Sequence, residues 1–170
     1  MEEDAAIKEQ LAYYRARAPE YDECFYGQGR YDRGPQHRAE WLRELRLIEA
    51  ELQPRVHGKT VLELAAGTGL WTKRLLDAGA QVMAVDGSPE TLAINRDRVR
   101  SSQVQYQIAD IFSWRPRTTF DVVFFSFWLS HVPPYLFNDF WKMVHAALKP
   151  KGRVFFIDEQ QPAEREDVIS

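Results

Sequence analysis

The stretch VLELAAGTGLWTKRLL, residues 61–76, decides the fold. It begins as a short apolar strand, passes through a turn that contains Gly67 and Gly69, and continues as a helix. The two glycines leave room for a ligand to approach the backbone, and the amides that open the helix face that ligand. We therefore expect the turn to hold a nucleotide-like molecule.

The chain around this stretch alternates between strand and helix patterns. Short apolar runs predict strands at residues 60–64, 81–85, 104–108, 120–127 and 153–157. Segments with helical periodicity or helix-capping residues predict helices at residues 70–78, 89–99 and 134–148. This order predicts a doubly wound α/β fold, with a mostly parallel Rossmann-like sheet of about five strands and right-handed crossovers.

Two more helices are predicted before the sheet. The first covers residues 5–18 and is closed by Pro19. The second covers residues 35–52 and is ended by Pro54 and Gly58. It carries one apolar face, made of Trp41, Leu45, Ile48 and Leu52. The segment between them, residues 21–33, is rich in aromatic residues and glycine and predicts an irregular loop.

Composition narrows the class of protein. The 170 residues suit one domain, and 45% hydrophobic content is ordinary for a globular chain. A net charge of −3 argues against a protein that coats nucleic acid or an anionic membrane. A single cysteine, Cys24, cannot form an internal disulfide, and we find neither a secretory signal nor a membrane span. We therefore expect a cytoplasmic protein, and we assign no metal site.

Polar residues at the ends of the next two strands complete a nucleoside pocket. Asp86 lies seventeen positions after Gly69, where a carboxylate can accept hydrogen bonds from both hydroxyls of a ribose. Asp110 and Ile111 end the third strand and suit the amino group and the ring of adenine. A structural alternative exists for Asp110, which could cap the short turn after it.

Two other nucleotide sites fit less well. The dinucleotide fingerprint has a third glycine where this chain has Thr72, and Trp71 adds bulk to the first turn of the helix. A Walker-type phosphate loop needs a G-K-[ST] sequence, which is absent here. The nucleoside therefore carries no pyrophosphate on this interpretation.

The sequence resembles the class I S-adenosylmethionine-dependent methyltransferases, and in particular their small-molecule branch. The resemblance covers residues 60–158 in the family's order and spacing. It rests on ELAAGTG (63–69), Asp86, Ala109-Asp110-Ile111, FDVV (120–123) and LKPKG (148–152). The family's first turn glycine is Ala65 here, and one glycine of its usual LKPGG turn is Lys151. Since Gly67 and Gly69 remain, we expect binding to be kept.

The resemblance implies a role for each matching residue near the turn. Glu63 and the backbone at Ala65 and Gly67 would hold the methionine end of S-adenosylmethionine, with Gly69 completing the turn. Asp86 would take the ribose hydroxyls.

At the other end of the cofactor, the resemblance assigns Gly87 and Ser88 to the adenosine edge and Asp110 with Ile111 to the adenine. Ser88 is also explained as the N-cap of the helix that begins at Pro89.

Ser126 and Phe127 would flank the sulfonium and the acceptor. Transfer from a sulfonium is an in-line displacement, which needs alignment and exclusion of water more than acid–base chemistry. His131 follows the fourth strand and is the candidate general base, with helix capping or packing as the alternative. Trp128 lines the acceptor pocket or fills core.

The resemblance also implies that an N-terminal helical segment folds over the cofactor. Tyr14 and Tyr21 are the candidates for contact with the methionine end, and Tyr13 lies beside them. Ordinary aromatic packing is the alternative for each. We divide the single domain into a helical cap (1–55), a cofactor-binding core (59–158) and a polar tail (159–170).

Two further sequence features, a proline motif and a run of arginines, bear on whether the acceptor is a nucleic acid. VPPY, residues 132–135, is similar to the D/N-P-P-Y motif of amino-methylating DNA enzymes, but it has Val132 at the acidic or amide position and begins about five residues late. Arg96, Arg98 and Arg100 read as the solvated end of a helix. A small molecule is therefore the expected acceptor, with no nucleic acid or membrane partner.

Family members continue past the fifth strand with a helix and two more strands, and only twelve residues follow Asp158. A truncation, a homodimer that covers the exposed sheet edge, and loss of activity are three explanations. The leading hypothesis is a small-molecule methyltransferase. The alternative is a donor-binding fragment or partner subunit without catalysis, and a Rossmann oxidoreductase follows far behind.

Overall fold

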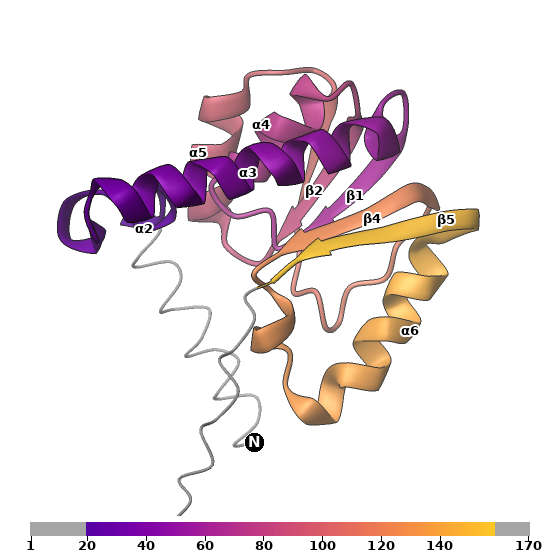
Figure 1. Ribbon diagram of the computed structural model, residues 1–170. Helices are drawn as coiled ribbons and strands as arrows, with labels where there is room; N and C mark the ends of the chain where they lie inside the picture. The colour runs from indigo at the N-terminus through magenta and orange to yellow at the C-terminus, as the bar shows by residue number, and fades with distance from the viewer. Residues whose placement is uncertain (1–19, 159–170) are drawn as a thin grey trace, which may run out of the picture.

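The computed structural model describes residues 20–158, which form a single parallel sheet with helices on both faces (Figure 1). The sheet has five strands in the order β3-β2-β1-β4-β5, and every neighbouring pair is parallel. The strands are β1 (Thr60–Leu64), β2 (Gln81–Asp86), β3 (Val104–Ile108), β4 (Phe120–Ser126) and β5 (Leu148–Ile157). The predicted doubly wound α/β fold is confirmed.

Three helices cover one face of the sheet and one covers the other (Figure 1). The first group is α3 (Pro35–Val56), α4 (Leu70–Asp77) and α5 (Pro89–Val99). The opposite face carries α6 (Phe137–Ala147). Short helical segments complete the described chain: α2 (Tyr21–Phe25), and the 3-10 turns η2 (Gly29–Tyr31), η3 (Leu129–His131) and η4 (Pro134–Leu136).

Alternating residues of the central strands build two separate cores. In β4, Val122 and Phe124 pack on the side of α3 and α4, whereas Val123 and Phe125 pack against α6. A strand that is buried on both faces must be apolar at every position, which explains the continuous run that predicted it. Leu45 and Leu52 of α3 are buried in the first core, and Trp41 and Ile48 pack against it, as the predicted apolar face requires.

The expectation of an irregular loop over residues 21–33 was wrong, because this segment contains α2. Phe25 is buried against Trp41, with ring centroids 5.4 Å apart, and this burial favours the helical turn over an irregular path. Gly27 ends the helix with φ +58, while the amide of Gln28 donates to the carbonyl of Glu23. This is the Schellman pattern, and Gly27 was its signal in the sequence.

Two boundaries also differ from those predicted. Helix α3 extends to Val56, with Pro54 inside its last turn, where a proline removes only one hydrogen bond. Strand β5 begins at Leu148 rather than at Arg153, and it accommodates LKPKG through a register shift opposite Phe120 and Val122. The predicted helix over residues 5–18 lies outside the described residues.

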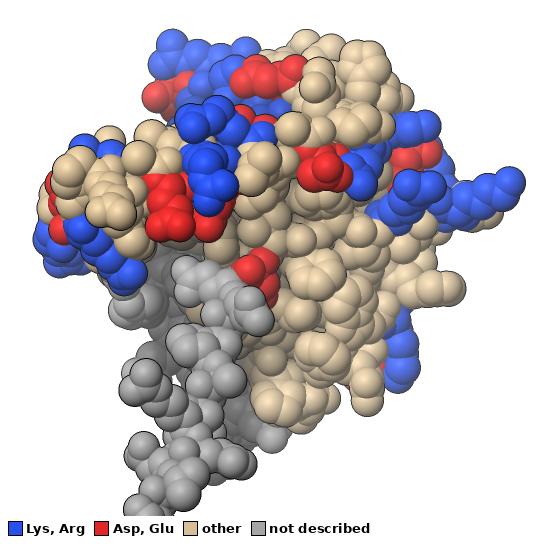
Figure 2. Space-filling view, in the orientation of Figure 1, with Lys and Arg blue, Asp and Glu red and all other residues tan. Residues whose placement is uncertain are grey.

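The edge of β5 opposite β4 pairs with no other strand of residues 20–158. Phe156 on this strand is 48% exposed, and it stacks on Phe125 of the neighbouring strand with ring centroids 5.4 Å apart. The surface over β4, β5 and α6 is mostly uncharged, whereas charged side chains gather over the helices of the other layer (Figure 2). Between Glu20 and Asp158, no helix combines the length and apolarity needed to cross a bilayer.

Candidate functional site

The carboxyl ends of β1, β2, β3 and β4 meet at one edge of the sheet. The connection after β1 leads to α4 on one face, and the connection after β4 leads toward α6 on the opposite face. The chain therefore diverges between the adjacent strands β1 and β4. Open parallel sheets bind their ligands in the crevice at such a point.

The turn after β1 has an unusual backbone. Ala65, Gly67 and Gly69 have φ values of +52, +54 and +90, so three of five residues lie in the left-handed region. The amide of Ala66 donates to the carbonyl of Val85 at 3.1 Å, which joins the turn to the end of β2. Among residues 20–158, a Cβ on Gly67 would meet one atom within 4 Å, the carbonyl oxygen of Ala65 at 3.9 Å, so these residues leave space on this side of the turn.

Gly69 is required for a different reason. A Cβ placed there would lie 2.5 Å from Oδ1 and 3.0 Å from Cα of Asn95, so α5 packs directly on the turn. Our expectation that Gly69 makes room for the ligand is therefore corrected, because Asn95 fills that space. Close packing of a helix on the turn is the task of the third glycine in dinucleotide sites, and here Gly69 performs it toward α5.

Asp86 fixes the turn from the end of β2. Its Oδ2 accepts from the amide of Gly67 at 2.9 Å, and its Oδ1 accepts from the amide of Ser88 at 2.8 Å and from the hydroxyl of Thr91 at 3.2 Å. Burial raises the pKa of this carboxyl, and the backbone hydrogen bonds oppose that rise. Asp86 and Gly67 are both partly exposed at the edge where the carboxyl ends of the strands meet.

Glu63 lies behind the turn instead of facing the crevice. It is 2% exposed, and its Oε2 accepts from the hydroxyl of Thr72 at 2.6 Å. Burial raises the pKa of Glu63 to about 8, against the opposing effect of the Thr72 hydrogen bond and with a smaller contribution from the charge of Asp86. Thr72, which replaces the third glycine, therefore supplies a hydroxyl to a buried acid.

This raised pKa predicts a pH dependence of stability. Between the usual glutamate pKa of 4.5 and the raised pKa of about 8, the folded chain keeps a proton on Glu63 that the unfolded chain has lost. The free energy of unfolding should therefore fall as pH rises through this window. Urea unfolding at several pH values should show a weaker decline in Glu63→Gln than in the wild type. Equal slopes in the two proteins would contradict a protonated Glu63.

The expected adenosine residues follow β2 and β3. Ser88 is 2% exposed, and its hydroxyl oxygen caps α5 by accepting from the amide of Thr91 at 3.1 Å. Only the backbone around Gly87 and Ser88 is thus suited to contact a ligand. Asp110 is exposed, and its Oδ1 accepts from the amide of Phe112 at 3.1 Å, so it does cap the following turn. Ile111 is 5% exposed and belongs to the core beneath this edge.

The end of β4 is strained. Phe127 has φ +51, which is costly for a residue with a bulky side chain, and its amide donates to the carbonyl of Ile157 at 2.8 Å. Its ring packs against Phe25 of α2 and Trp41 of α3. Strain of this kind is common where a fold positions residues for function. Ser126 precedes it as the last residue of β4 and pairs with Ile157.

His131 lies at the end of η3, in the segment that follows β4. It is partly buried, and burial lowers its pKa, while the charge of Asp158 acts in the opposite direction. Its ring centroid lies 6.3 Å from that of Trp128, which in turn stacks on Phe112. The imidazole is therefore mainly neutral at pH 7, which is the form that can accept a proton.

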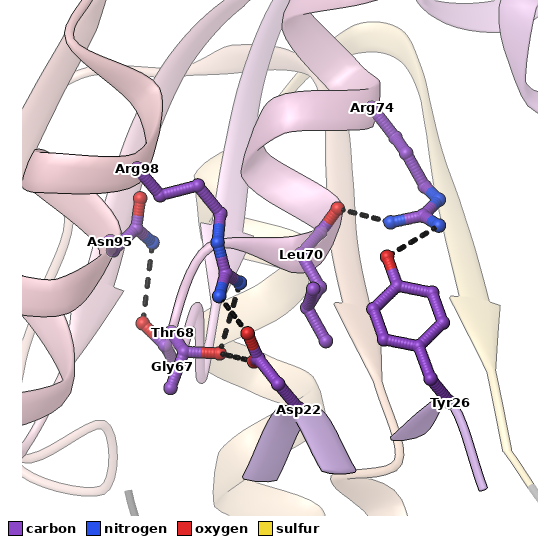
Figure 3. A network of polar contacts seen from close by, with 8 residues as sticks. All are labelled: Asp22, Tyr26, Gly67, Thr68, Leu70, Arg74, Asn95 and Arg98. Carbon is purple, nitrogen blue, oxygen red and sulfur yellow. Dashed lines mark hydrogen bonds and ion pairs between the residues drawn. The ribbon is translucent and has the colours of Figure 1, made fainter. Parts of the chain in front are cut away.

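Helix α2 is fastened to the glycine turn by charged residues (Figure 3). The hydroxyl of Thr68 donates to Asp22 at 3.1 Å and accepts from Arg98 at 3.3 Å, and Arg98 forms an ion pair with Asp22. The interpretation of Arg98 as part of the solvated end of a helix was therefore wrong, because its side chain pairs with Asp22 of α2. Tyr21 is 37% exposed at the start of α2, and Tyr14 lies outside the described residues.

A second anchor of α2 is Tyr26, whose hydroxyl accepts from Arg74 at 3.3 Å (Figure 3). Arg74 also donates to the carbonyl of Leu70 at 2.7 Å and pairs with Glu49 at 2.7 Å. Roles for Thr68, Asn95 and Arg74 were not predicted from the sequence, because their partners are distant in the chain and leave no spacing pattern. The one local signal was the presence of polar threonines at 68, in the glycine turn, and at 72, in the helix after it.

The backbone of Ala65 leads to a stability prediction. A left-handed conformation costs about 1–2 kcal/mol for a residue with a Cβ, and glycine offsets part of that gain by about 0.5–1 kcal/mol of chain entropy. Ala65→Gly should therefore raise the free energy of unfolding by about 0.5–1 kcal/mol in urea denaturation. Ala50→Gly, on the exposed side of α3, is the control and should be destabilising. A loss of stability in both variants would contradict strain at Ala65.

Comparison with known proteins agrees with this geometry. Residues 61–152 match the family model for a methyltransferase domain. An uncharacterized methyltransferase from Staphylococcus carnosus is 30% identical over 91% of this chain and 70% of its own length. A ubiquinone biosynthesis O-methyltransferase from Idiomarina loihiensis is 36% identical over 58% of this chain and 42% of its own.

Solved structures give the same result. The DhpI–SAH complex has 37% identity and a TM-score of 0.76, covering 91% of this chain and 70% of that one. The glycopeptide N-methyltransferase MtfA with S-adenosyl-L-homocysteine has 25% identity and a TM-score of 0.58, covering 66% of this chain and 50% of that one. The chain thus spans between two fifths and seven tenths of the length of these relatives. It belongs to the family of class I S-adenosylmethionine-dependent methyltransferases.

Proposed function

We propose that this chain binds S-adenosylmethionine at the glycine turn and transfers its methyl group to a small-molecule acceptor. The observation that carries the proposal is the arrangement of Asp86 beside Gly67. A carboxylate at the end of β2 is hydrogen-bonded to the amide of an open glycine turn at 2.9 Å, and both groups are partly exposed. This arrangement suits a ligand with a ribose diol next to a small charged group.

The methionine end would lie on the turn itself. The backbone at Ala65 and Gly67 would contact it. Tyr21 would contact it as well, since it precedes Asp22, which accepts from the hydroxyl of Thr68 in this turn. We assign Glu63 and Gly69 supporting roles, because Glu63 is buried against Thr72 and Gly69 packs against Asn95. Tyr14 remains a prediction for this end of the cofactor.

The adenosine end would extend along the ends of β2 and β3. We propose that Asp86 accepts from the ribose hydroxyls and that the backbone of Gly87 and Ser88 borders the adenosine. Asp110 would accept from the adenine amino group, and Ile111 would support the ring from below. In this proposal residues 59–158 form the cofactor-binding core.

When bound, the cofactor supplies an electrophilic methyl group on a sulfonium, whose carbon–sulfur bond breaks as the acceptor forms its bond to carbon. The chain's own residues orient the reactants and exclude water. Ser126 and Phe127 at the end of β4 would border the methyl group, and the stacked rings of Trp128 and Phe112 would offer an aromatic wall. Where the acceptor must lose a proton, the neutral imidazole of His131 would accept it.

A small molecule is the proposed acceptor. Named relatives act, according to their names, on demethylmenaquinone, in ubiquinone biosynthesis and on glycopeptides. The test is methyl transfer from radiolabelled donor to a panel that includes phenolic quinone precursors, amines and glycopeptides. Turnover by the wild type, and its loss in Asp86→Asn, would support the proposal. Tight donor binding without turnover of any acceptor would instead favour a non-catalytic donor-binding subunit.

A further inference from the structure

A buried chain of hydrogen bonds connects strand β3 to the glycine turn. The hydroxyl of Tyr106 donates to Oδ1 of Asn95 at 3.0 Å. The side-chain amide nitrogen of Asn95 donates to the hydroxyl of Thr72 at 2.8 Å. The same nitrogen donates to the carbonyl of Gly67 at 3.3 Å, and Figure 3 shows this second bond. Thr72 in turn donates to Glu63 at 2.6 Å. We call these four side chains the Asn95 relay.

The chemistry of the partners fixes the direction of each bond. A carbonyl can only accept, so Gly67 must face the nitrogen of the Asn95 amide rather than its oxygen. Oδ1 of Asn95 then accepts from Tyr106, and Thr72 accepts from Asn95, which leaves the hydroxyl hydrogen of Thr72 for Glu63. Both hydrogens and the oxygen of the asparagine amide are satisfied, so the amide has one favourable orientation.

Gly67 is consequently held at both of its polar atoms. Its amide donates to Asp86, the proposed ribose acceptor, and its carbonyl accepts from Asn95. Asn95 is fully buried and lies against Gly69, so it also limits the position of the next glycine. A glycine without such partners has wide conformational freedom, and ordering it on binding would weaken affinity.

We propose that Asn95 is a cofactor-positioning residue, which holds the Gly67 peptide in the orientation that receives the methionine end, and that Tyr106 and Thr72 hold Asn95 in turn. The inference rests on the proposed cofactor site. It predicts that residues with no ligand contact control affinity. Tyr106 is the most distant of them, since it belongs to β3 and its hydroxyl is connected to the turn through Asn95.

The test is calorimetric titration with S-adenosylhomocysteine. Tyr106→Phe leaves Oδ1 of Asn95 without its donor, whereas Thr72→Val leaves both the Asn95 amide nitrogen and Glu63 without their hydroxyl partner. Each variant should weaken binding by roughly tenfold. Thr72→Ser keeps the hydroxyl and should bind within about twofold of the wild type. Because the two hydroxyls act through one amide, the double variant Tyr106→Phe/Thr72→Val should weaken binding by less than the product of the single effects.

Val144→Ala separates positioning from general destabilisation. Val144 belongs to α6 and is buried in the core on the opposite face of the sheet, so this variant should lose stability in urea without losing affinity. Wild-type affinity in Tyr106→Phe and Thr72→Val would overturn the inference, as would a loss no larger than that of Val144→Ala.

A second readout does not depend on binding. Hydrogen exchange at the amide of Gly67 in the ligand-free protein should be faster in Tyr106→Phe than in the wild type, whereas a distant helix amide such as that of Val144 should exchange at an unchanged rate. Unchanged protection of Gly67 would overturn the inference even if the cofactor binds. Failure of the wild type to bind S-adenosylhomocysteine would instead overturn the proposed function.

Discussion

Replacing Asp86 by asparagine is expected to weaken S-adenosylhomocysteine binding by roughly 100-fold, which follows from losing two charge-assisted hydrogen bonds to a ribose at about 1.5 kcal/mol each. The carboxylate of Asp86 accepts hydrogen bonds from the backbone amides of Gly67 at 2.9 Å and Ser88 at 2.8 Å. The side-chain nitrogen of asparagine cannot accept, so one of these two bonds would also be lost. Isothermal titration calorimetry, performed well below the unfolding temperature of the variant, measures the change directly.

Asp77→Asn is the matched control for charge. Asp77 is exposed at the end of α4, where it pairs with Lys73 one helical turn earlier. The variant has the same net charge as Asp86→Asn but should bind with wild-type affinity, since exposed pairs contribute little. An equal loss in the two variants would mean that the total charge, rather than the ribose contact, sets affinity.

Gly69→Ala is expected to be strongly destabilising although it adds only one methyl group. Its φ of +90 strains any residue with a Cβ, and that Cβ would lie 2.5 Å from the buried amide of Asn95 and 3.0 Å from the backbone of α5. Strain of about 1–2 kcal/mol and overpacking of about 1–3 kcal/mol together predict a loss of about 2–5 kcal/mol in the free energy of unfolding. Urea denaturation measures this loss, and binding should decrease with it.

Gly58→Ala separates the two contributions. Gly58 follows the end of α3 in the left-handed region, with φ +69, and a Cβ there meets no atom of residues 20–158 within 4 Å. This variant should lose only the strain contribution, so the difference between the two alanine variants reports the contact with Asn95. Equal losses at the two positions would contradict tight packing of α5 on the turn.

The fold was largely predictable because its signals are local. The continuous apolar run of β4 and the Ser88-Pro89 helix start both lie within a few residues of the elements they specify. The segment around α2 was not predictable in this way, because Phe25 becomes helical through burial against Trp41 and Trp71, which are distant in the chain. Gly27 as a helix-ending glycine was the one local signal, and its neighbouring glycines masked it.

The site was predictable in outline and less so in detail. The positions of Asp86 and Gly67 followed from spacing along the chain, and the structure brings them into contact. The direction in which a side chain points depends on neighbours from other elements, so Glu63 turned out to face Thr72 behind the turn. Asn95 appeared to be an ordinary helix residue, although it connects α5, α4 and the turn.

The most direct test of the central claim is calorimetry of the wild-type chain with S-adenosylhomocysteine and with NAD⁺ under the same conditions. Binding of one S-adenosylhomocysteine per chain, with no detectable NAD⁺ binding, is the predicted result. It follows from the carboxylate of Asp86 beside an open Gly67 and from a turn whose third glycine is replaced by Thr72. A folded chain that binds NAD⁺ more tightly, or that binds neither ligand, would contradict the account.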